Sequence, residues 1–158
     1  MNTDAIVVWN NIALNAVAND HTGAAQTVNQ RGPTRTARAL AIVHVAMFDA
    51  FNVIARAFTP YLKNLPPAPG SASKEAAIAQ AAFTTLTALY PGQTNTFNTE
   101  LNNFLNTLPP GSPRNEGIAV GTDIGKRILD NRNNDRSNDS MPYQPGGLPG
   151  QHDVDPLN

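Results

Sequence analysis

The sequence RTARALAIVHVAMFDAFNVIARAF, residues 35–58, decides the fold. In its apolar middle, only His44, Asp49 and Asn52 are strongly polar. A helix that is apolar on all sides is normally surrounded by protein. We therefore predict a central apolar helix over residues 33–57, with the other helices packed around it.

The composition excludes several classes of protein. The 158 residues have a net charge of -1, without the clustered basic footprint that binding to nucleic acid requires. The absence of cysteine excludes disulfides and thiolate metal sites. The apolar middle of about 16 residues is shorter than the roughly 20 that cross a bilayer, so we expect no membrane span. No signal peptide is visible, and the localisation stays open.

The rest of the chain predicts an all-α, single helical bundle of about five helices, followed by an extended C-terminal arm. Apolar residues recur at helical spacing over residues 3–18, 74–89, 94–108 and 114–132. We place the helical domain at residues 1–132. Residues 133–158 are mostly Asn, Asp, Pro, Gly and Ser, and such a segment cannot build a core of its own. This segment is expected to be disordered or to lie as an arm on another surface.

Three glycines recur every four residues on one side of the last predicted helix, at Gly117, Gly121 and Gly125. Glycine in a helix interior costs about 1 kcal/mol relative to alanine. Three glycines in register therefore indicate a close approach by another helix.

Asp49 is the first candidate functional residue, because a buried carboxylate without partners is strongly disfavoured. It needs either an arginine, with Arg38, Arg127 and Arg132 as candidates, or several backbone or side-chain donors. We interpret Asp49 as a structural anchor between helices. A role as general acid or base is the alternative.

His44 and an arginine cluster are the other candidates. No histidine or carboxylate lies three or four residues from His44, so we interpret it as a hydrogen-bonded core histidine and predict no metal site. Arg31, Arg35 and Arg38 cluster near a predicted helix N-terminus, whose free N–H groups favour anions. They form either a phosphate-like or carboxylate contact or, as we favour, a solvated or salt-bridged face.

Four segments carry a resemblance to a known family, over about residues 7 to 135. The chain resembles the N-terminal helical half of the vanadium-dependent haloperoxidase group, which is related to the type 2 phosphatidic acid phosphatases. The segment ARALAIVHVAMFDAFN is its most specific part. The segments are VVWNNIALNAV, RTARALAIVHVAMFDAFNVI, YLKNLPPAPGSASKEAAIAQAAFTTLTALYP and GIAVGTDIGKRILDNRNND.

The resemblance implies an all-helical fold that binds vanadate or phosphate through lysine, arginine and histidine motifs in a C-terminal half. The Lys-x-x-x-x-x-x-Arg-Pro and Ser-Gly-His motifs do not occur in these 158 residues. No catalytic residue is therefore carried over to this chain, and no cofactor is assigned to it. Vanadate or phosphate would belong to a C-terminal part or to a second chain.

These observations lead to three hypotheses about function. The first is an N-terminal scaffold part or subunit of a vanadium haloperoxidase-like or acid-phosphatase-like protein, inactive alone. Under this hypothesis the chain is either one piece of a split or cleaved enzyme or a fragment of a longer protein. The alternative is a stand-alone helical binding or assembly module without enzymatic activity, which would self-associate or hold a partner helix. A third, weaker hypothesis is a small metal or anion site that uses His44, Asp49 or the arginine cluster.

Overall fold

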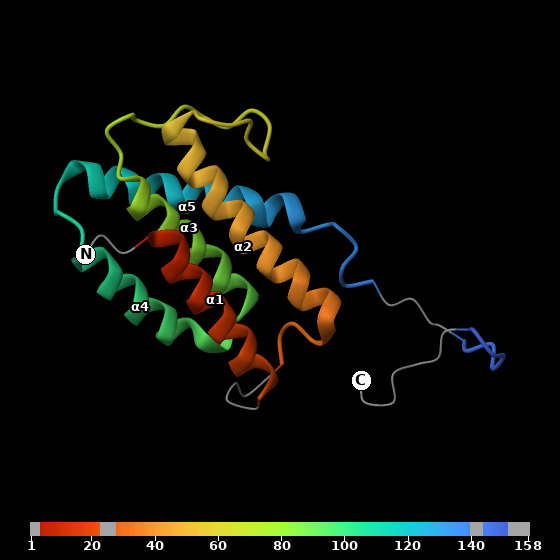
Figure 1. Ribbon diagram of the computed structural model, residues 1–158. Coiled ribbons are helices and arrows are strands. Elements are labelled where there is room, and N and C mark those ends of the chain that lie inside the picture. The colour runs from red at the N-terminus through yellow and green to blue at the C-terminus, as the bar shows by residue number, and fades with distance from the viewer. Residues whose placement is uncertain (1–3, 23–27, 140–143, 152–158) are drawn as a thin grey trace.

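The helical periodicity of the sequence becomes five α-helices in the structure, a computed structural model that describes residues 4–22, 28–139 and 144–151 (Figure 1). Within these ranges there is no strand, and one short 3-10 turn, Pro91–Gln93, precedes the fourth helix. The prediction of an all-α bundle is confirmed. The helices are α1 (Ala5–His21), α2 (Gly32–Ala55), α3 (Lys74–Leu89), α4 (Thr94–Asn106) and α5 (Ser112–Arg132).

The most enclosed helix is α3, which contacts each of the other four helices. Ten of its 16 residues are buried, and many of these are alanines. The apolar helix α2 contacts α1, α3 and α5 but keeps part of its surface exposed, including Ala41 and Phe48. The small side chains of α3 let neighbouring helices approach it from several directions.

The closest packing in the bundle joins α5 to α3, and glycine makes it feasible. A β-carbon at Gly117 would overlap the carbonyl oxygen of Ser73, the N-cap of α3, and one at Gly121 would overlap the carbonyl oxygen of Ala77. One at Gly125 would lie 2.8 Å from Cβ of Thr84. Real β-carbons essentially never come so close to other atoms. The close approach predicted from the glycine spacing is confirmed, and its partner is α3.

The two outer helices cover the remaining sides of α3. Trp9 of α1 is fully buried. The apolar stripe predicted from the sequence of α4 and the residues after it lies on the inner side of this amphipathic helix, and its asparagines face outward. Three members are buried and two are partly buried: Phe97, Leu101 and Phe104, and Leu105 and Leu108. Both helices therefore follow from the sequence pattern, because each buries one apolar stripe.

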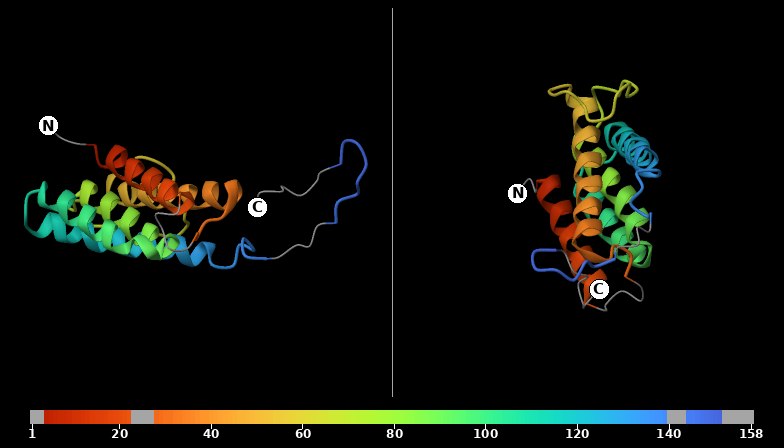
Figure 2. Two further views of the ribbon diagram at one scale, coloured as in Figure 1. Left: turned by 90° about the horizontal axis from the view of Figure 1, so that it is seen from below. Right: turned by 90° about the vertical axis from the view of Figure 1, so that its right-hand side faces the viewer.

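The start of the segment after α5 is attached to the bundle. Asp135 is paired with Arg38 of α2 at 2.7 Å. Residues 144–151 are exposed and lie away from the helices (Figures 1 and 2). The other residues of the predicted arm lie outside the described ranges, and the domain boundary at residue 132 stays a prediction.

Among the described residues, α2 alone has the length and hydropathy of a membrane-spanning helix. Half of its apolar window is buried inside the bundle. Because a buried core helix passes the same test, this finding does not show a membrane span.

We predict that Gly121→Ala destabilises the protein. The new methyl group would lie 2.7 Å from Cβ of Gln80 and would overlap the carbonyl oxygen of Ala77, so α5 must move away from α3. Overpacking costs about 1–3 kcal/mol, which outweighs the gain of about 1 kcal/mol in helix propensity. We expect the free energy of unfolding, measured by urea denaturation, to fall by about 1–2 kcal/mol.

Gly92→Ala is the matched control, because a β-carbon at Gly92 meets nothing within 4 Å. Its effect should stay within about 0.5 kcal/mol. A Gly121→Ala variant as stable as the unsubstituted protein would contradict the close α3–α5 packing.

Candidate functional site

The four residues singled out from the sequence do not form one site. Arg35 and Arg38 line the side of α2 that faces the C-terminal end of α5. His44 contacts α1. Asp49 lies beneath the loop that follows α2. The sequence placed them all on one helix, but they project from it in different directions.

Asp49 fastens that loop to the helix. Its carboxylate is fully buried and accepts hydrogen bonds from the backbone N–H groups of Tyr61 at 2.8 Å and Leu62 at 2.9 Å. Burial raises the pKa of Asp49, and the hydrogen bond from Leu62 opposes part of that rise. Nearby, Asn52 accepts from the N–H groups of Ala57 and Phe58 in the same loop.

None of the three arginines considered as partners of Asp49 contacts it. Arg38 binds Asp135 at 2.7 Å, and Arg127 binds Asp123 at 2.7 Å. The guanidinium of Arg132 lies over the ring of Tyr61, 5.3 Å from its centroid. The arginine alternative is therefore wrong, because the loop returns over its own helix and brings backbone donors closer than any cationic side chain.

His44 is partly buried between α2 and α1, with a hydrogen-bond partner at each ring nitrogen. Nδ1 lies 2.8 Å from the carbonyl oxygen of Leu40, and Nε2 lies 3.1 Å from Oδ1 of Asn10. Each ring nitrogen therefore has an oxygen atom of the protein within hydrogen-bond distance. In the described part of the chain, no group of three or more His, Cys, Asp or Glu residues could hold a metal ion.

Asp20 is a buried carboxylate that the sequence analysis missed. It is fully buried at the end of α1 and accepts from the backbone N–H groups of Asn29 at 2.8 Å and Gln30 at 2.9 Å. Together with burial, its charge raises the pKa of Tyr90 to about 12. Its position in a polar run at a helix end gave no sign of burial.

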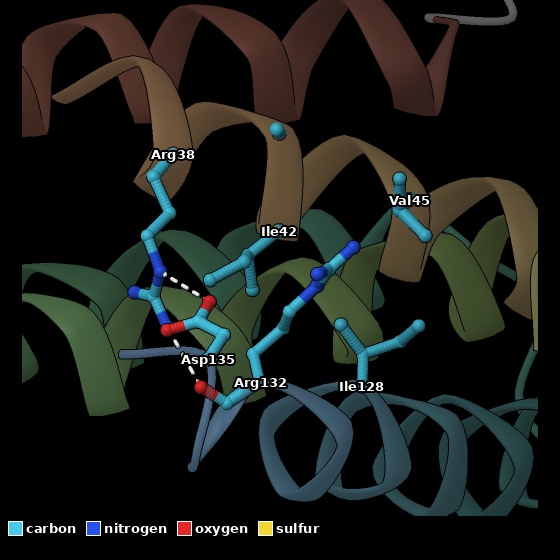
Figure 3. Close-up of a pocket in the computed structure, with 7 residues that line it drawn as sticks. Arg38, Ile42, Val45, Ile128, Arg132 and Asp135 are labelled. Carbon is cyan, nitrogen blue, oxygen red and sulfur yellow. Dashed lines mark hydrogen bonds and ion pairs between the residues drawn. The ribbon is translucent and has the colours of Figure 1, made fainter. Parts of the chain in front are cut away.

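A groove lies between α2 and α5, next to Arg35 and Arg38 of the predicted arginine cluster (Figure 3). One part of it, of about 220 Å³, is mostly apolar and contains the side chain of Arg132. The adjoining part, of about 400 Å³, is polar and includes Arg35. Arg38 borders both parts, but its guanidinium is engaged by Asp135 and by the carbonyl oxygen of Arg132 at 2.9 Å. Arg31 lies outside this groove, near the start of α2.

The ion pair between Arg38 and Asp135 keeps the carboxylate of Asp135 charged. The hydrogen bond from Arg38 lowers the pKa of Asp135 to about 2. Arg38 therefore adds no net positive charge to the groove.

A comparison with known protein families matched residues 1–156 to the family described as the vanadium chloroperoxidase N-terminal domain. The chain belongs to that family. The resemblance of the helical segments to the haloperoxidase group is thus confirmed over nearly the whole chain. No curated protein and no solved structure matched the chain.

Among the described residues, those that line the α2–α5 groove do not fit a vanadate or phosphate site of the family type. Such an oxyanion needs several fixed cations and a histidine that exchanges protons. In the groove, Arg38 is neutralised by Asp135, and no histidine is among the lining residues. His44 is instead bonded toward α1.

We predict that Asp49→Ala destabilises the protein by about 3 kcal/mol or more. The substitution leaves the partly buried N–H groups of Tyr61 and Leu62 without their acceptor, and each unpaired group costs about 1–3 kcal/mol. Urea denaturation followed by circular dichroism measures the change. Asp123→Ala is the control, since its carboxylate is half-exposed in a surface pair with Arg127, and the change should be small. A shift of under roughly 0.5 kcal/mol for Asp49→Ala would mean that the carboxylate does not hold the loop.

We also predict a pH-dependent contribution from Asp135. Its pKa is lowered to about 2 in the folded protein from an ordinary value of 3.8. A carboxyl group with a lowered folded-state pKa stabilises the protein above its unfolded-state pKa and loses that effect as the pH falls. The stability difference between the unsubstituted protein and Asp135→Asn should therefore be constant above about pH 5 and shrink below about pH 4.

Urea titrations at several pH values test this expectation. Arg38→Gln should reproduce the effect, because it removes the other member of the same pair. A difference that persists unchanged below about pH 3 would show that the pair is not its source.

Proposed function

We propose that this N-terminal domain is the scaffold part or subunit of a vanadium haloperoxidase-like or acid-phosphatase-like protein, and that it is inactive alone. Membership of residues 1–156 in a family described as an N-terminal domain is the observation that carries the proposal. The reactive machinery would then lie in a C-terminal half or in a second chain. That part would supply the lysine, arginine and histidine groups that hold vanadate or phosphate.

The way this domain uses its charged side chains supports a structural role. Asp20 and Asp49 bind backbone N–H groups of the following loops. Arg38 and Asp135 bind each other across α2 and the segment after α5. These groups are committed to holding the fold, so they are poorly suited to exchange protons with a substrate.

A scaffold is useful to this chemistry because an oxyanion site works only when its donors are held in place. Side chains built on rigid helices are positioned more accurately than side chains on loops. The closely packed α3 and α5 would offer such a rigid base to a second part of the protein.

Exposed apolar side chains favour a second candidate function, a stand-alone module that binds a partner or a second copy. Ile6, Val7 and Leu14 are exposed on α1, and Phe48 and Phe58 form an exposed ring pair 6.2 Å apart at the end of α2. Light scattering separates the two functions. A well-folded homo-oligomer that needs no second polypeptide would favour the module.

We expect the purified 158-residue chain to show neither bromide oxidation nor phosphate-ester hydrolysis, because the groups that would hold the oxyanion lie elsewhere. The assays follow bromination of a dye with peroxide, bromide and vanadate, and release of nitrophenol from its phosphate ester. A complete vanadium haloperoxidase is the positive control, and heat-denatured chain is the blank. A vanadate-dependent rate above the blank would contradict the proposed inactivity.

A further inference from the structure

The guanidinium of Arg132 is unpaired in the α2–α5 groove. Its side chain rises from the last turn of α5 and points between Ile42 and Val45 of α2 (Figure 3). It is partly buried, and among the described residues no oxygen acceptor binds its nitrogen atoms. A guanidinium has five N–H donors, so this position has strong donors to offer to a ligand.

Two contacts hold Arg132 in this position. The ring of Tyr61 lies against the guanidinium, and the Tyr61 backbone is fastened by Asp49. The Arg132 carbonyl oxygen accepts a hydrogen bond from Arg38 at 2.9 Å. The fork of N–H groups on a guanidinium matches the two oxygens of a carboxylate.

The residues around Arg132 determine the size and polarity of the ligand that could carry that carboxylate. Ala41, Ile42, Val45 and Ile128 line this part of the groove, whose volume is about 220 Å³. Drug-sized ligands occupy pockets of about 300–1,000 Å³, so this space suits a short aliphatic body or one side chain.

The charge balance favours a single negative charge. Arg38 is already neutralised by Asp135, which leaves Arg132 as the uncompensated cation of the apolar part. A doubly charged oxyanion would find too few donors there and would lie against apolar side chains.

We propose that the α2–α5 groove binds a carboxylate carried on a short aliphatic body, with Arg132 as its anchor. The carboxylate comes either from a free aliphatic acid or from an aspartate or glutamate side chain with apolar neighbours. The site itself is independent of the proposed function. Only the second source rests on it, because such a side chain would belong to the polypeptide that completes the protein.

The test uses hexanoate as the probe and hexanamide as its neutral analogue, with binding followed by NMR chemical shifts of the ¹⁵N-labelled chain. Hexanoate should shift signals from α2 and α5. The affinity for hexanamide should be lower by at least about tenfold. Arg132→Gln should weaken hexanoate binding about tenfold or more, since hydrogen bonds to charged groups contribute about 1.5–3 kcal/mol. Arg132→Lys keeps the positive charge but loses the forked N–H groups. Its affinity for hexanoate should lie between that of the unsubstituted protein and that of Arg132→Gln.

Arg127→Gln is the matched control. It removes the same charge from the same helix, but Arg127 is paired with Asp123 and does not line the groove. Its hexanoate affinity should be unchanged. Equal losses in the Arg127 and Arg132 variants, equal binding of hexanoate and hexanamide, or no binding of hexanoate would each overturn the proposal.

A peptide pair distinguishes the two sources. Acetyl-Leu-Glu-Leu-amide and its glutamine analogue have no free termini, so only the glutamate side chain supplies a carboxylate. Tighter binding of the glutamate peptide than of hexanoate would support a polypeptide source, and the reverse order a free acid. The catalytic assays of the chain are separate from these binding measurements. The proposed carboxylate site and the proposed inactivity can therefore be contradicted independently.

Discussion

The close contact between α3 and α5 is the constraint on which the rest of the structure depends. Three glycines, Gly117, Gly121 and Gly125, remove the side chains that would otherwise separate the two backbones. Because α5 lies so near α3, α2 can pack against both helices at once. The same contact determines where the last turn of α5 ends, and therefore where Arg132 enters the groove. A substitution at one of these glycines would therefore move Arg132 in the groove, although none of the glycines lines it.

Buried acceptors fasten the connections between helices. Asp20 and Asp49 each capture two successive backbone N–H groups in the loop that follows their own helix. Asn52 does the same for a neighbouring part of one loop. Backbone N–H groups left unpaired in the interior would be costly, so these side chains allow irregular loops to lie against the core. In both loops a buried carboxylate on the preceding helix pairs backbone N–H groups that would otherwise lack an acceptor.

The sequence predicted what depends on periodicity and missed what depends on three-dimensional enclosure. Helical spacing indicated all five helices, and the glycine repeat indicated a close contact. The enclosure of α3 was not visible, because hydropathy measures how apolar a residue is and alanine scores modestly. The partners of Asp49 were not visible either, since every residue except proline offers the same backbone N–H and the pattern cannot say which loop will return. Asp20 was missed for the same reason.

The position of the groove matters for how a second part of the protein could be attached. Arg132 ends α5, and Asp135 pins the next few residues to α2 through Arg38. The chain therefore leaves the bundle at the C-terminal end of α5 (Figure 1), where Arg132 and Asp135 line the groove. The entropy cost of closing a loop grows slowly with its length, so a polypeptide segment following in sequence could return to this groove with little penalty. A carboxylate on such a segment would meet a positioned arginine whose own neighbours carry no net charge. A single pairing of that kind would fix the register of a second domain without contributing to its chemistry.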